Sequence, residues 1–145
     1  MDLFTAMQTS SSALAAERTR MNLVSSNLAN ANTTRTPEGG PYKRKDAVFT
    51  ATPITQGGFG ASLDRASGMV QQVEVTKIVE DKNPPRLVYD PTHPDANAQG
   101  YVAMPNVNVV EEMADMINAT RAYEANVTAA QAAKNMALKT LEIGQ

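Results

Sequence analysis

The sequence predicts an α+β fold, in which long N- and C-terminal helices pair as a coiled-coil-like inner domain beside a small, β-rich and turn-rich middle. All eight prolines lie between Pro37 and Pro105, and seven of the eight glycines lie between Gly39 and Gly100. Proline destabilises a helix interior by about 3 kcal/mol and glycine by about 1 kcal/mol. Both ends of the chain are therefore free to form long helices. Apolar residues also recur at heptad spacing in both ends.

The N-terminal helix is expected over residues 3–32. One apolar row recurs every seven residues, whereas the neighbouring row is interrupted by Ser10 and Glu17. The regular row comprises Met7, Leu14, Met21 and Leu28. Asparagines crowd the end of this helix, which has two interpretations: the helix frays into a loop, or the amides bond to neighbouring backbones or chains.

The C-terminal helix is expected over residues 108–143. Its apolar residues alternate steps of four and three, as in a coiled-coil seam. The seam includes Val109, Met113, Met116, Tyr123, Val127 and Leu141. A helix of this span is roughly 54 Å long, which is too long to be covered by a small core. We therefore expect the seam residues of both helices to form subunit interfaces. An ordinary helical hairpin packed on a small core is the alternative.

The middle of the chain, residues 33–106, alternates short apolar runs with turns. Strands are expected at 42–51, 69–80, 86–89 and 101–104, where β-branched and aromatic residues concentrate. The glycines at 57, 58 and 60 predict a flexible loop. Alternation along the first strand would place Tyr42 and Arg44 on one face and Lys43 and Lys45 on the other. The expected domain boundaries are 1–32, 33–106 and 107–145.

Composition argues against several classes of function. A net charge of −2 gives no electrostatic footprint for nucleic acid, and no apolar run reaches the ~20 residues of a membrane helix. Cysteine is absent, which removes thiol chemistry and disulfides. The one histidine, His93, lies between Asp90 and Asp95, but a solvated loop is a better interpretation than a metal site. No nucleophile and base are spaced for catalysis, so we expect no enzyme, no cofactor and no metal.

The start of the chain does not match a cleaved secretory signal. Asp2 stands where such signals carry positive charge, and residues 8–12 are polar where they are apolar. If the protein leaves the cytoplasm, we expect it to use another route.

Two motifs in the helical ends resemble those of the bacterial flagellar rod and hook proteins. In that family the first helix ends in an S-x-N-[LIVM]-A-N-x-x-T pattern, followed by a loop and an aromatic-basic step. The matching residues here are Ser26, Asn27, Leu28, Ala29, Asn30 and Thr33, followed by Pro37 and Tyr42-Lys43-Arg44. Residues 118–126 resemble the family's C-terminal helix. The short middle fits a proximal-rod member better than the longer distal-rod and hook proteins.

The resemblance implies a non-enzymatic building block of the flagellar basal body. Members pair their terminal helices as an inner domain, stack helically around a central channel and carry the β-rich middle outside. They pass through the flagellar type III export apparatus without a cleaved signal. The rod that they build crosses the periplasm and transmits motor torque. Implied partners are further copies, neighbouring rod proteins and the adaptor at the rod base.

Two other classes of protein stay open at this point. One is another type III-secreted coiled-coil protein, such as a needle or translocator component. The other is an enzyme of the same compartment, such as a cell-wall hydrolase.

Overall fold

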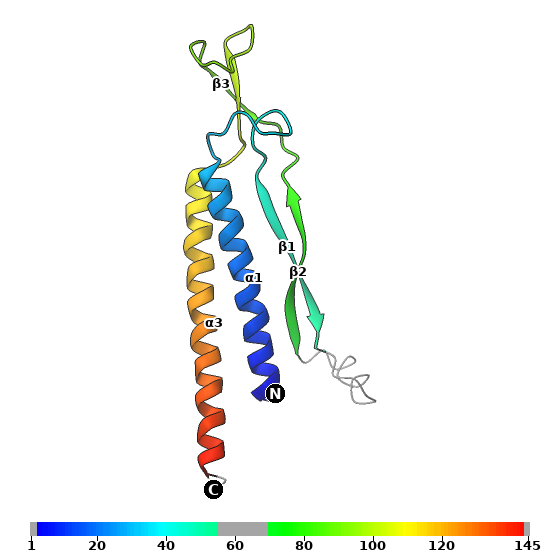
Figure 1. The fold of residues 1–145 in the computed structure, drawn as a ribbon, viewed down its shortest axis with the longest axis vertical. Helices are drawn as coiled ribbons and strands as arrows, with labels where there is room; N and C mark the ends of the chain where they lie inside the picture. The colour runs from blue at the N-terminus through cyan, green and yellow to red at the C-terminus, as the bar shows by residue number, and fades with distance from the viewer. Residues whose placement is uncertain (1–2, 55–69, 144–145) are drawn as a thin grey trace.

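The computed structural model describes residues 3–54 and 70–143. Within these residues the chain forms two long helices and two separate two-stranded sheets (Figure 1). The elements in chain order are α1 Leu3–Ala29, β1 Lys45–Pro53, β2 Gln71–Glu80, β3 Arg86–Tyr89, β4 Tyr101–Met104 and α3 Val109–Ile143. The glycine loop expected at residues 57–60 lies outside the described residues. The α+β fold with two long terminal helices is confirmed.

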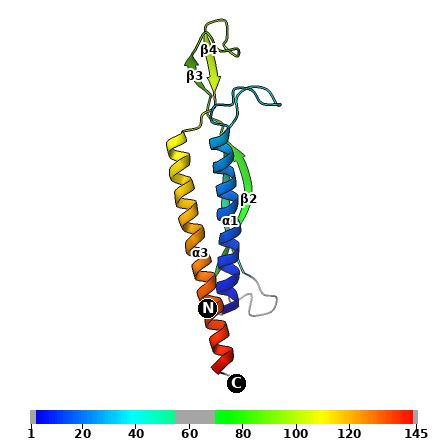
Figure 2. The same ribbon diagram turned by 60° about the vertical axis from the view of Figure 1, so that its left-hand side comes forward.

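Helix α1 is the central layer of an elongated molecule. It packs against α3 on one side and against β1 and β2 on the other, and Figures 1 and 2 show this order from two directions. A helix covered on two sides cannot carry one clean apolar stripe, because polar side chains on its second face contact the hairpin. Ser12 shows this: its Oγ accepts a hydrogen bond from the backbone N–H of Val73 in β2 (3.1 Å). Polar residues of α1 therefore have a structural role on the side of the helix that faces the hairpin.

Strands β1 and β2 form an antiparallel ribbon along α1. The pairing runs from Lys45 with Glu80 to Pro53 with Gln71, and a bulge follows Val48. The guanidinium of Arg20 in α1 lies 4.6 Å from the ring centroid of Phe49. This cation–π contact joins the helix to the ribbon where the bulge re-aims the strand.

Strands β3 and β4 form a second hairpin beyond the ends of the helices (Figure 2). The rings of Tyr89 and Tyr101 meet edge to face, with centroids 5.3 Å apart. Gly100 precedes β4 with φ +81°, and a Cβ there would lie 2.9 Å from the Tyr89 ring. Both features require glycine at this turn. Val102 within β4 and Pro105 just after it are fully buried, so the hairpin has a small buried centre of its own.

The helix pair is joined mainly by small side chains. On α1 the buried apolar residues are Ala16 and Val24, with Ala31 just after its end. On α3 they are Ala119 and Ala133. Alanine lets two helix backbones approach closely, and larger side chains of α3 such as Met116 and Tyr123 are half-buried beside it.

This packing agrees with part of the predicted seam on α3 and differs from it in part. The first row is as expected, since Met116 and Tyr123 are half-buried. In the second row Val127 is half-buried too, but Met113 is 52% exposed, and the buried positions of α3 are 112, 119 and 133. Hydrophobicity favours the large apolar residues for such a seam, whereas close packing of the two helices buries the alanines. A weak contact remains in the predicted phase, because Thr120 Oγ1 lies 3.8 Å from Met21 Sδ.

Helix α3 is longer than its partner. Its 35 residues span about 52 Å, against about 40 Å for the 27 residues of α1. Both ribbon views show the C-terminal end of α3 running past the start of α1 (Figures 1 and 2). Within the described residues, neither helix is long and apolar enough to cross a membrane.

Candidate functional site

The side chain of Asn27 lies at the centre of a buried polar junction between α1, the start of β1 and the start of α3. It is 1% exposed. Its Nδ2 donates to the carbonyl of Lys45 (2.9 Å) and to Glu112 Oε2 (3.0 Å). Its Oδ1 accepts from the Lys45 N–H (2.9 Å) and from Tyr42 Oη (3.0 Å). The amide thus uses two donors and two acceptors, which only asparagine can supply at this length.

Glu112 is the second buried polar residue of the junction, also 1% exposed. Its two carboxylate oxygens have different partners: Oε2 accepts from Asn27, and Oε1 accepts from Arg44 Nε (2.5 Å). Arg44 also pairs with Asp46 (3.2 Å). Partial burial opposes the charged form of Arg44, but its hydrogen bonds to Glu112 and Asp46 outweigh this and raise the pKa of the guanidinium. The buried carboxylate is therefore neutralised by a permanent positive charge.

The loop between α1 and β1 is closed by hydrogen bonds of the signature residues. Asn30 Nδ2 donates to the carbonyl of Ser26 (2.9 Å), and Thr33 Oγ1 donates to Asn30 Oδ1 (3.1 Å). The backbone N–H of Tyr42 donates to the carbonyl of Thr33 (3.0 Å). The loop thereby places Lys45, the first residue of β1, next to the side chain of Asn27.

Of the two interpretations of the asparagine-rich helix end, bonding to neighbouring backbone is correct for Asn27 and Asn30. In the family signature, Leu28 is half-buried and Ala29 is exposed.

The side-chain directions around the start of β1 follow the expected alternation, whereas one buried residue of the junction was not expected. Tyr42 and Arg44 both reach into the junction, whereas Lys43 and Lys45 lie 4.0 and 3.8 Å from Glu80, so their predicted alternation is confirmed. Sequence reasoning missed Glu112, because an acid in the first turn of a helix is already explained by its favourable interaction with the helix dipole. A signal was present: Glu112 lies one heptad before Ala119, on the face that packs against α1.

The start of α3 is fixed by Asn108. Its Oδ1 accepts from the N–H of Val110 (3.1 Å), and its carbonyl accepts from the N–H of Glu112 (3.0 Å). This is an N-cap. It sets the phase of α3 that points Glu112 inward and leaves Val110 75% exposed.

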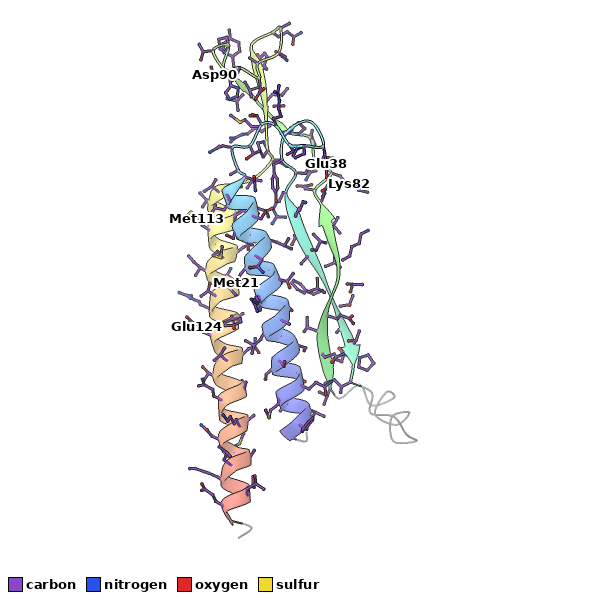
Figure 3. The ribbon with its side chains drawn as sticks, in the orientation of Figure 1. Met21, Glu38, Lys82, Asp90, Met113 and Glu124 are labelled. Atoms are coloured by element: carbon purple, nitrogen blue, oxygen red, sulfur yellow. The ribbon has the colours of Figure 1, made fainter. Side chains whose placement is uncertain are left out.

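The predicted interface residues fall into two groups. Leu14, Met21, Leu28, Met116, Tyr123 and Val127 are half-buried along the helix pair. Met7, Val109, Met113 and Leu141 are 39%, 43%, 52% and 69% exposed. Figure 3 labels Met113 on the side of α3 away from α1. Contacts between subunits at these residues stay a prediction.

The His93 loop joins the second hairpin to the loop after α1. His93 Nδ1 accepts from the Asp95 N–H (3.1 Å). The Asp95 carboxylate accepts from Thr34 Oγ1 (2.8 Å) and pairs with Arg35 (3.0 Å). Nearby, hydrogen bonds from Thr92 lower the pKa of Asp90. These groups hold the loop together, and the described residues contain no cluster of three or more His, Cys, Asp or Glu side chains that could hold a metal.

Comparison with known proteins places both helical ends in flagellar families. Residues 7–35 match the family described as "Flagella basal body rod protein". Residues 98–143 match "Flagellar basal body rod FlgEFG protein C-terminal". The first match covers most of α1 and the loop that follows, and the second covers β4 and α3. The class of protein is therefore that of flagellar basal-body rod proteins.

Full-length relatives narrow this class. The chain is 47% identical to the flagellar basal-body rod protein FlgC of Bacillus subtilis, with 100% of both chains covered. It is 45% identical to FlgC of Borreliella burgdorferi over 100% of this chain and 99% of that protein, and 41% identical to FlgC of Salmonella typhimurium over the whole of both. The chain belongs to the FlgC family of flagellar basal-body rod proteins. Of the two coiled-coil classes left open by the sequence, the rod protein is therefore correct, and the other type III-secreted coiled-coil protein is excluded.

Proposed function

We propose that this chain, a structural rod subunit of the flagellar basal body, builds the proximal part of the rod by helical assembly around an export channel and transmits motor torque. The observation that carries the proposal is the unfinished surface of α3. Large apolar side chains are exposed along α3, a helix of about 52 Å. They are not needed for the packing of α3 on α1, where small residues are buried. A rod in which many such helices lie side by side would cover these surfaces and resist twisting.

The proposed inner domain combines residues 1–32 with 107–145, and residues 33–106 form the outer part. The packing of α1 on α3 supports this division. The polar junction lies where the two parts join, because Asn27, Arg44 and Glu112 come from α1, the start of the middle segment and α3. Torque acting on the outer part would then reach the helices through a buried, fully bonded contact.

The proposed partners are further copies of the chain, neighbouring rod proteins, the adaptor at the rod base and the flagellar export apparatus, which the chain would pass without a cleaved signal. We propose no catalytic role. In support, the buried acid Glu112 has both oxygens occupied by Asn27 and Arg44. The side chain is also 1% exposed, so a substrate in solution would not reach this carboxylate.

The experiment is gene deletion in the host bacterium with complementation by an epitope-tagged chain. We expect deletion to abolish swimming and the rod, and the tagged chain to appear in purified basal bodies seen by electron cryomicroscopy. Complete rods without the chain, or a restored flagellum from which the tagged chain is missing, would overturn the proposal. The substitution Glu112→Gln tests for catalysis. If Glu112 were a catalytic acid, this variant would still assemble the rod but would lose the activity.

A further inference from the structure

The contacts that hold α3 on the rest of the molecule are concentrated at its start. Within the described residues, the side-chain hydrogen bonds and ion pairs from α3 to other segments come from Glu112, Asp115 and Thr120. Farther along, Asn126 and Thr128 donate to carbonyls of their own helix, at 2.9 Å in each case. Directional contacts to α1 and to the residue before β1 therefore fix the first third of α3, whereas the other two thirds are held by packing.

The packing of the last two thirds of α3 on α1 is thin. Among residues 121–142 the buried one is Ala133, which is 4% exposed, while Tyr123, Val127 and Ala137 are half-buried. An alanine removes little apolar surface from water, so such contacts contribute little stability. No glycine or proline interrupts α3, so nothing in its sequence favours a break within the helix. A continuous rod that is fixed at one end can leave its partner as a unit when that end is released.

The fixed end of α3 depends mainly on Glu112. Its carboxylate is 1% exposed and is bonded on both oxygens, to Asn27 and to Arg44. The nearby acid Asp115 is 51% exposed and 3.9 Å from Arg44, so this ion pair is long and screened by water. Thr120 adds only the 3.8 Å contact with the sulfur of Met21. Glu112 therefore supplies most of the directional contact that holds α3.

We propose that the bonds of Glu112 to Asn27 and Arg44 form a latch that controls whether the whole of α3 is docked on α1. With the latch open, α3 leaves α1 along its entire length, while α1 and the ribbon of β1 and β2 stay folded together. The latch is a property of the single chain, so this inference stands apart from the proposed role in the rod.

The ribbon can stay on α1 because other residues hold it there. Ser12 Oγ accepts a hydrogen bond from the backbone N–H of Val73, and Arg20 lies against the ring of Phe49. None of these four residues belongs to α3, so their contacts survive when α3 leaves. Segments of one protein that open separately in this way have their own opening free energies.

Two other ways of exposing the far end of α3 compete with the latch. The C-terminal end can fray by itself while Glu112 stays bonded, because helix ends open locally at little cost. Alternatively, α3 can leave only when the whole molecule unfolds. In the first case the exposure of the far end does not depend on Glu112, and in the second it depends equally on contacts within the ribbon.

A single buried thiol at the far end of α3 distinguishes the three cases. The chain has no cysteine, so Ala133→Cys introduces a unique thiol. Position 133 is buried and lies 21 residues from Glu112, about 32 Å along the helix. The rate of its reaction with a maleimide is measured on the full-length chain. When opening and closing are fast, this rate is proportional to the open population. Circular dichroism checks that Ala133→Cys alone keeps the helix content of the unchanged chain.

The first comparison opens the latch. We expect Glu112→Ala to raise the reaction rate of the thiol at position 133 about a hundredfold, since breaking a buried pair shifts an equilibrium by roughly this factor. The milder Asn27→Ala should raise it about tenfold, because only one of the bonds of Asn27 goes to Glu112. The matched control is Glu111→Ala at the exposed neighbouring position, which should change the rate less than about threefold.

The second comparison weakens the ribbon and leaves the latch intact. Phe49→Ala removes the ring that contacts Arg20, so its urea midpoint should fall. The thiol rate should stay within about threefold, because the ribbon is folded in both the docked and the undocked state and both lose the same contact. Equal acceleration by Phe49→Ala and Glu112→Ala would show that α3 opens only with the whole molecule. No acceleration by Glu112→Ala or Asn27→Ala would show that the end frays alone. Either result would overturn the latch.

Discussion

The two ends of the helix pair are built in opposite ways. At one end, Asn27 and Glu112 are buried, and their polar atoms are bonded to Arg44, Tyr42 and the backbone of Lys45. At the other end, α3 continues without a partner and large apolar side chains face solvent. The first end is complete within one molecule, whereas the second can be completed only by another molecule.

This difference shows what each type of residue contributes. A buried polar network is worth little net stability, but it penalises every arrangement in which its groups lose their partners. It therefore suits the end where three segments must meet in one geometry. Exposed apolar side chains contribute nothing until they are covered. They suit the end where association should depend on concentration and neighbours.

The largest effect is expected when the buried acid is removed. Glu112→Ala leaves Asn27 without one acceptor and Arg44 without its buried partner. Because the side chain of Arg44 is 26% exposed and can turn to water, we expect the free energy of unfolding to fall by about 3 kcal/mol, the low end for a broken buried pair. Urea unfolding followed by circular dichroism measures it. Glu111→Ala, at the exposed neighbouring position, should change stability by less than about 0.5 kcal/mol; equal effects would contradict the junction.

The second effect concerns the central amide. Asn27→Ala removes four hydrogen bonds and leaves the backbone N–H and C=O of Lys45 without side-chain partners. We expect a loss of about 2 kcal/mol in the same unfolding measurement. The matched control is Asn22→Ala, an exposed asparagine of the same helix, which should be nearly neutral. If the two variants behaved alike, the asparagines would be only signals of helix fraying.

A third substitution tests the region between the two ends. Ala119 is fully buried against α1, whereas Ala125 is exposed on the same helix. Ala119→Leu forces extra methyl groups into a close helix contact and should reduce the free energy of unfolding by about 2 kcal/mol. Ala125→Leu should have little effect, as thermal unfolding of both variants can show. Equal effects of the two substitutions would contradict close packing at Ala119.

The sequence predicted the elements well where breakers and periodicity are strong. Strands Arg86–Tyr89 and Tyr101–Met104 are confirmed at both ends, and α3 begins one residue after its expected start at position 108. The first strand was expected at 42–51 but runs over Lys45–Pro53, because Tyr42 and Arg44 turn into the junction before the ladder begins. The first helix ends at Ala29 and not at residue 32. Just after its end, the N–H of Ala31 donates a hydrogen bond to the carbonyl of Leu28, three residues back, and this tighter turn replaces the α-helical pattern.

The candidate site was only partly predictable, for two physical reasons. The seam phase depends on which side chains let backbones approach, and hydrophobicity ranks Met113 above Ala119 although the alanine makes the contact. The partner of Asn27 depends on tertiary contact over 85 residues, which no local pattern encodes. The family signature did include Asn27 of the junction, and it also includes Ser26, Asn30 and Thr33, which bond to one another locally.

The smallest effect on the stability of the isolated chain is expected at the C-terminal end of α3. This end gives the sharpest test of the difference between the two ends of the helix pair. Leu141 is 69% exposed, so Leu141→Ser removes almost no packing within the molecule. We expect the free energy of unfolding to change by less than about 0.5 kcal/mol. In cells, the same variant should lower the amount of chain recovered in basal bodies and the fraction of swimming cells. A large loss of stability would show that α3 is already covered at this end; unchanged recovery and swimming would show that no neighbour covers it.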